Sequence, residues 1–146
     1  MGAWDNGNFG NDDALDFLAD VNDNGKAEIY NAINRIVASP ADEYLESPEC
    51  CIALAAIEFI AAAIANPAKD FSEEAKEWLA KNKLLPFTSE DLPNIISANV
   101  DIITFSKQAI DKIKTNSELK ELWEESEEYE EWLSVTDNLK ARISQA

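Results

Sequence analysis

The segment 50–65 constrains the fold more than any other part of the chain, because every residue in it is apolar except Glu58. Ser47 stands before it as a favourable helix cap, and Pro48 suits the first helical position. A helix that is apolar on all sides is buried in the protein interior. The segment is too short to span a bilayer comfortably and carries an acid near its middle. We therefore expect residues 48–65 to form the Ala-rich central helix of a bundle.

The rest of the chain repeats a helical pattern. Apolar residues recur at intervals of three and four between helix-capping and helix-breaking residues, and no strand-like alternation competes. The other expected helices span about residues 12–21, 26–38, 72–82 and 89–115, then one beginning at Ser117 and a last one around 129–143. No linker or repeat divides the 146 residues. The expected fold is a single all-α domain, residues 1–146, built as a bundle of about six or seven helices.

The formal net charge is −17, from 29 acidic against 12 basic residues. A field of this sign repels the phosphates of nucleic acids and the headgroups of anionic lipids, whereas it attracts cations and basic proteins. The excess is larger than solubility requires. The charge therefore predicts neither a nucleic acid nor a membrane as partner, and it favours a basic protein.

The chain carries no recognisable catalytic set. It contains no histidine, which removes the commonest general base and any Ser–His or Cys–His pair. The adjacent residues Cys50 and Cys51 would be strained as a disulfide, so we expect them to be reduced and to pack as small apolar side chains. No secretion signal opens the chain. We expect a cytoplasmic protein that is monomeric when free, with no cofactor and no enzymatic activity.

The run Asp20–Gly25 matches the start of a calcium-binding loop, with oxygen ligands at alternate positions and glycine at the sixth. The twelfth position should carry a bidentate glutamate, but Asn31 occupies it, and Ala27 replaces the usual branched apolar residue at the eighth. Runs of Asn, Asp and Gly also form ordinary turns. We interpret this run as a turn between helices and predict no metal site there.

Glu58 is the most conspicuous single residue, because a carboxylate on an apolar helix is costly unless it is paired or hydrogen-bonded. One interpretation is a buried catalytic acid with a raised pKa. The other, which we favour, is a structural acceptor. Its donors would be a tryptophan indole, Arg35 or backbone amides of the N-terminal segment.

Two acid-dense regions are candidate partner-binding surfaces. Residues 118–131 hold eight acids in fourteen positions, a density that destabilises helices. The preferred surface, with two aromatic anchors, consists of Glu121, Trp123, Glu124, Glu125, Glu127, Glu128, Tyr129 and Glu131. The alternative surface consists of Asp42, Glu43, Glu46 and Glu49. The higher density of acids and the aromatic neighbours favour the C-terminal surface, but both remain candidates.

The opening residues resemble a bacterial family of small all-α domains of unknown function, whose members begin W-x-x-G-x-F-x-N-D-x-A. The matching residues are Trp4, Gly7, Phe9, Asn11, Asp12 and Ala14. The resemblance continues over the Ala-rich segment 49–63 and more weakly over 119–123 and 132–139. It implies an all-α fold and no established activity. Physically, the two aromatic residues of the motif would fill the core, Gly7 would permit a tight turn, and the Asn-Asp pair would cap the first helix.

The composition also resembles that of acidic immunity proteins and antitoxins, which neutralise basic nuclease toxins. A nuclease has a positive cleft for phosphates, and an acidic protein can mimic that polyanion and block the cleft. The function we expect is therefore an inhibitor of a basic ribonuclease or deoxyribonuclease toxin. The alternative is a structural or adaptor domain, and a remote one is a hydrolase using clustered carboxylates and a metal.

Overall fold

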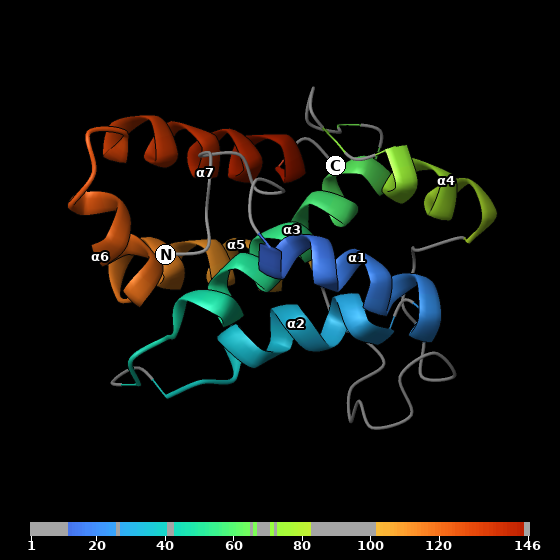
Figure 1. Cartoon of the computed structure of the whole chain (residues 1–146), viewed down its shortest axis with the longest axis horizontal. Helices are drawn as coiled ribbons and strands as arrows, with labels where there is room; N and C mark the ends of the chain where they lie inside the picture. Colours follow the sequence, from blue (N-terminus) through green and yellow to red (C-terminus); the bar gives the residue numbers. More distant parts are fainter. Residues whose placement is uncertain are drawn as a thin grey trace.

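The computed structural model describes residues 12–25, 27–40, 43–64, 66, 71, 73–82 and 102–144. Within these ranges the chain forms seven helices and no strand, so the expected all-α fold is confirmed (Figure 1). The helices are α1 (Asp12–Asn24), α2 (Ala27–Val37), α3 (Ser47–Ala63), α4 (Glu73–Lys81), α5 (Ile102–Thr115), α6 (Glu118–Glu124) and α7 (Tyr129–Ile143).

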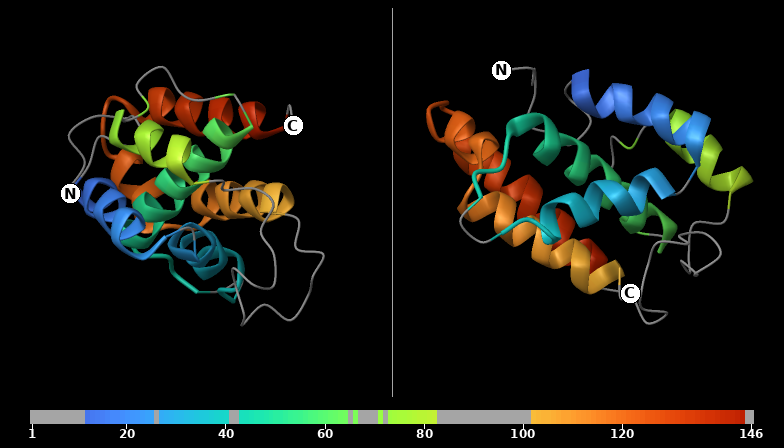
Figure 2. Two further views of the ribbon diagram at one scale, coloured as in Figure 1. Left: turned by 90° about the vertical axis from the view of Figure 1, so that its right-hand side faces the viewer. Right: turned by 90° about the horizontal axis from the view of Figure 1, so that it is seen from below.

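Helix α3 is the centre of the bundle and contacts each of the other six helices. The views in Figures 1 and 2 show it running through the molecule, with the remaining helices arranged around it. Eleven of its residues are buried, including both cysteines and Glu58. Four of the buried residues are alanines, Ala53, Ala55, Ala56 and Ala61, as expected for an Ala-rich central helix. The helix begins at Ser47 with Pro48 in its first turn, where proline loses no hydrogen bond.

Phe59 connects three helices at one end of this core. Its ring makes edge-to-face contacts with Phe17 of α1 at 6.3 Å, with Phe71 at 5.7 Å and with Trp78 of α4 at 5.7 Å between ring centroids. Edge-to-face pairs at these separations add to the free energy gained by burial alone. The cluster therefore fixes α1 and α4 against the same end of α3.

Helix α2 is held at its C-terminus by a cation from α5. The Lys112 ammonium donates to the carbonyl oxygens of Ile36 at 3.3 Å, Val37 at 3.2 Å and Ser39 at 2.6 Å. The last carbonyls of a helix have no partner within the helix and carry partial negative charge. Lys112 satisfies them and ties α2 to α5, which pack closely side by side.

One helix boundary differs from the sequence expectation, and another falls outside the described residues. Helix α1 does not end near Val21 but continues to Asn24, and Gly25, with φ +90°, stops it. The amide of Gly25 donates to the carbonyl of Val21 at 2.8 Å, a common helix ending that favours glycine. The expected helix 89–115 is described only from Ile102 onward, and its earlier part lies outside the described residues.

Candidate functional site

The buried carboxylate of Glu58 is paired with a cation from the C-terminal helix. Glu58 is 2% exposed, and its Oε1 and Oε2 accept from Nη1 and Nη2 of Arg142 at 2.8 and 3.0 Å. Arg142 also donates to the carbonyl of Asn66 at 3.2 Å, so the end of α3 is fastened to α7. The bidentate geometry is that of a strong structural ion pair. It supports the interpretation of Glu58 as an acceptor.

Arg35, one of three donors considered for Glu58, pairs with other acids. Arg35 lies near the C-terminus of α2 and contacts Glu49 at 2.7 Å and Glu43 at 3.6 Å. Sequence reasoning missed Arg142 because it is separated from Glu58 by 84 positions, and only tertiary packing brings α7 onto α3. The N-terminal segment, which supplied the other expected donors, lies outside the described residues.

The two acidic regions, treated as alternatives in the sequence, lie against each other in the structure. Leu45 and Ser117 form an isolated parallel bridge, in which the amide of Glu118 donates to the carbonyl of Leu45 at 2.8 Å. The amide of Ser47 in turn donates to Oε1 of Glu118 at 2.8 Å. One backbone–backbone and one backbone–side-chain hydrogen bond thus join the residues around the start of α3 to the start of α6. We call residues 43–49 together with 118–131 the acidic surface.

A tyrosine strengthens the junction between the two regions. The hydroxyl of Tyr44 donates to Oε2 of Glu121, on the exposed side of α6. The amide side chain of Asn116 donates to the carbonyl of Glu43 at 3.2 Å. Figure 1 shows α6 and the start of α3 together at one end of the long axis of the molecule. The two acidic regions therefore lie together at the same end of the molecule.

Most acids of the acidic surface are exposed and few are neutralised. Arg35 pairs with Glu43 and Glu49, and Lys120 pairs with Glu124 at 2.7 Å. Among the described residues, no cation forms an ion pair with Glu46, Glu125, Glu127, Glu128 or Glu130. Three of these acids form the turn between α6 and α7, where side chains extend into solvent. The surface is therefore a concentrated source of negative potential.

The aromatic residues of the acidic surface have different roles from those expected. Trp123, expected as an exposed anchor, is only 3% exposed, because its ring stacks on Trp132 of α7 in the core. Tyr129 is half-buried, and its ring also stacks on Trp132, with 6.3 Å between the two ring centroids. The spacing of apolar residues does not show that Trp123 and Tyr129 are covered, because α6 and α7 each have one buried and one exposed face.

Tyr44 is the exposed aromatic residue of the acidic surface, and sequence reasoning missed it. It is 48% exposed, the larger of two such values for large apolar side chains among the described residues. Its hydrogen bond to Glu121, then its partial desolvation and the charge of Glu121, raise its pKa to about 12. The one available signal was a tyrosine directly after two acids, Asp42 and Glu43, in a segment expected to lie outside any helix.

Several expected site residues lie outside the described part of the chain. These are the motif residues Trp4, Gly7, Phe9 and Asn11, together with Asp42 of the alternative surface. Asp12 begins α1. Cys50 and Cys51 are free and buried, as expected, and burial raises the pKa of each thiol to about 12. Such thiols are protonated and unreactive at neutral pH.

The chain matches a domain of unknown function, DUF4259, over residues 2–135. This protein belongs to the DUF4259 family. The expected relationship to a small domain of unknown function is thereby confirmed. No curated protein and no solved structure shows significant similarity to the chain. The matched range includes the opening motif, all of α3 and all of the acidic surface, so in this DUF4259 member the family pattern covers both candidate regions.

Two further observations bear on the kinds of site that this DUF4259 chain presents. In the described ranges, no group of three or more Cys, Asp or Glu side chains converges as metal ligands would. Asp20, Asn22 and Asn24 lie within α1, and alternate residues of a helix point in different directions rather than toward one ion. None of the described helices is both long and apolar enough to cross a membrane.

Proposed function

We propose that this protein is an acidic inhibitor of a basic protein, acting in the cytoplasm as an immunity protein or antitoxin that blocks the cleft of a nuclease toxin. The observation that carries the proposal is the joining of residues 43–49 and 118–131 into one acidic surface through the Leu45–Ser117 bridge. A nuclease cleft presents cations spaced to bind phosphates along a strand. A broad surface of carboxylates, rather than one short run, matches such a cleft.

The physical mechanism is charge mimicry with an aromatic anchor. The carboxylates without an ion pair steer a basic partner into encounter, which speeds association. Tyr44 then supplies contact area in the middle of the charged region, and its hydrogen bond to Glu121 fixes the ring in place before binding. Tyrosine loses little conformational entropy at interfaces and is frequent among residues that dominate binding energy.

The test is inhibition of the toxin encoded beside this gene, or of the basic protein that the purified chain captures. We would reverse Glu125, Glu127 and Glu128 to lysine in one variant. A matched control reverses Asp16, Asp20 and Glu77, exposed acids on α1 and α4, and changes the net charge equally. We expect the first variant to lose inhibition while circular dichroism shows an intact fold, and the control to inhibit nearly as well as the wild type.

The outcomes separate the proposal from its alternative. Equal inhibition by both variants would mean that the overall negative charge, and not the acidic surface, causes the inhibition. If no neighbouring toxin exists and the captured proteins are not basic, the chain is a structural or adaptor domain instead. In the second case Tyr44→Ala should also leave capture unchanged.

A further inference from the structure

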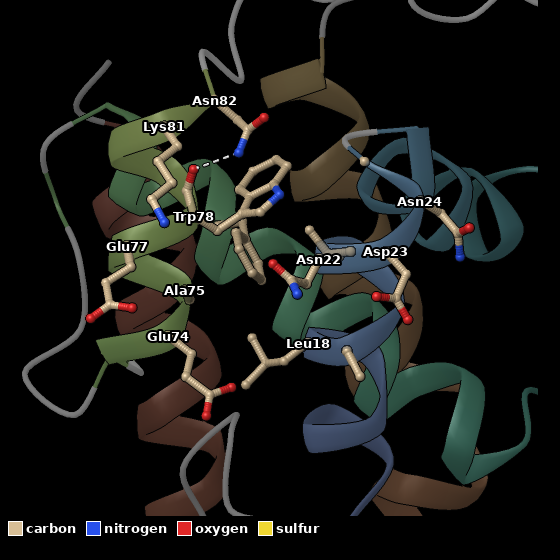
Figure 3. A pocket seen from close by; sticks show the side chains of 14 residues that line it. Leu18, Asn22, Asp23, Asn24, Glu74, Ala75, Glu77, Trp78, Lys81 and Asn82 are labelled. Carbon is tan, nitrogen blue, oxygen red and sulfur yellow. Dashed lines mark hydrogen bonds between the residues drawn. The ribbon is translucent and has the colours of Figure 1, made fainter.

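A pocket of about 620 Å³ lies between the C-terminal half of α1 and α4, at the opposite end of the molecule from the acidic surface (Figures 1 and 3). Its volume is in the range of sites that bind small molecules, roughly 300–1,000 Å³. The apolar part of its wall comes from Leu18, Val21, Phe59, Ala75 and Trp78. Phe59 and Trp78 belong to the aromatic cluster that fixes both helices, so the wall is rigid.

The charged groups of the pocket are mainly acidic, with Asp23, Glu74 and Glu77 against Lys81. In Figure 3, Glu74 lies on α4 and Asp23 on α1, the two helices that border the pocket, and the side chain of Asn22 is directed toward the space between these helices. The lining includes one cation, Lys81, which stands four residues after Glu77 on α4. Oppositely charged residues at this spacing on a helix attract each other. The net charge facing a ligand is therefore negative.

An exposed leucine extends the apolar wall along α1. Leu15 is 45% exposed and precedes Ala19, a lining residue, by four positions, so both lie on one face of the helix. Exposing a large apolar side chain has a free-energy cost that a ligand would relieve. The combination of apolar walls, an aromatic ring and carboxylates from both helices selects a ligand that is both apolar and cationic.

We propose that this pocket binds a small organic cation with an aromatic or aliphatic body. Asp23 and Glu74 hold the ammonium group, and Leu18 and Trp78 pack against the apolar body. A cation near the indole ring gains further attraction from its π-electrons. Anions of the same shape are rejected by the two carboxylates and by the net charge of −17. The site is independent of the proposed inhibitory function, because it shares no residue with the acidic surface.

The first experiment is an NMR titration of the ¹⁵N-labelled protein with 2-phenylethylammonium at about 0.15 M salt, where long-range attraction is largely screened. The control ligand is 3-phenylpropionate, which has the same ring and chain length but the opposite charge. We expect saturable shifts at Asn22, Asp23 and the Trp78 indole with the cation alone. Equal shifts with the anion, or shifts spread evenly over acidic residues elsewhere, would overturn the proposal.

The second experiment assigns the charge recognition to the pocket. The variant Asp23→Asn with Glu74→Gln should weaken binding of 2-phenylethylammonium at least about ten-fold, since it removes both charge-assisted contacts. A matched variant, Asp16→Asn with Glu125→Gln, removes two exposed charges outside the pocket and should change the affinity less than about two-fold. Equal weakening by the two variants would contradict the site. Neither result depends on toxin inhibition, so the two proposals can fail separately.

Discussion

At the scale of single residues, the ion pair between Glu58 and Arg142 makes the sharpest stability prediction. The side chains are 2% and 13% exposed, so water compensates little for the loss of either partner. Glu58→Leu should lower the free energy of unfolding by about 3 kcal/mol, because it leaves a largely buried cation unpaired. Urea unfolding followed by circular dichroism measures the change.

Two further variants decide whether pairing is the cause. Adding Arg142→Met to Glu58→Leu should restore much of the lost stability, since apolar replacements of a whole buried pair are often neutral or better. Arg35→Met should cost less than about 1 kcal/mol, because Arg35 is half exposed and its ion pairs are at the surface. If Glu58→Leu unfolds like the wild type, the ion pair is not structural.

The phenol of Tyr44 predicts a pH dependence. The hydrogen bond to Glu121 favours the neutral phenol and, with partial desolvation and nearby acids, raises the pKa from 10.0 to about 12. Because the folded state holds the proton more tightly, this stabilisation is complete below pH 10 and is lost as pH rises toward 12. An ultraviolet titration should find one late-titrating tyrosine that disappears in Tyr44→Phe. In Glu121→Gln it should titrate earlier, and an unchanged curve would contradict the contact.

At the scale of elements, the junction between α1 and α2 depends on Gly25. Its φ of +90° is strained for residues with a side chain, although a Cβ there would meet no atom within 4 Å. Gly25→Ala should therefore destabilise the fold by about 1–2 kcal/mol through the backbone alone. Gly25→Asn should cost less, because asparagine tolerates this region better. Equal thermal stability of the glycine and alanine proteins would show that the helix ends differently.

The helical conformation of Asp20–Asn24 carries a prediction about calcium. A calcium loop must turn its alternate oxygen ligands toward one centre, whereas α1 directs them around the helix, and Asn31 cannot replace a bidentate glutamate. Calorimetric titration with calcium should detect no micromolar site. Micromolar binding that Asp20→Ala abolishes would be the contrary result.

The elements show where sequence reasoning succeeds. The bounds expected for the central helix, 48–65, differ from Ser47–Ala63 by two residues at most, because continuous apolarity with proline at each end leaves few alternatives. Ser117 caps α6 as expected, its hydroxyl accepting from the amide of Lys120 at 3.0 Å. The sequence predicts an end of α1 near Val21, which is too early, because runs of Asn and Asp also favour turns. Only the backbone at Gly25 stops that helix.

At the scale of the whole molecule, the features of the candidate site that sequence reasoning missed depend on contacts between distant segments. Arg142 reaches Glu58 only when α7 packs on α3, and Trp123 is buried only because Trp132 covers it. The acidic surface exists because residues near position 45 pair with residues near position 117. Local periodicity determines which face of a helix is apolar, but it does not determine which helix covers that face.

The acids of this surface contribute both to the long-range field of the whole molecule and to local helix stability, and single neutralising variants separate these two effects. Glu125 is the C-cap of α6, where the helix dipole disfavours an acid, whereas Glu130 lies in the first turn of α7, where the dipole favours one. At low salt, Glu125→Gln should raise the urea midpoint and Glu130→Gln should lower it. Both should slow association with a basic partner, because the long-range field depends on summed charge. At about 1 M salt, where the Debye length is near 3 Å, all four differences should shrink. If the variant with higher stability also binds faster, the acids of this surface do not serve a partner.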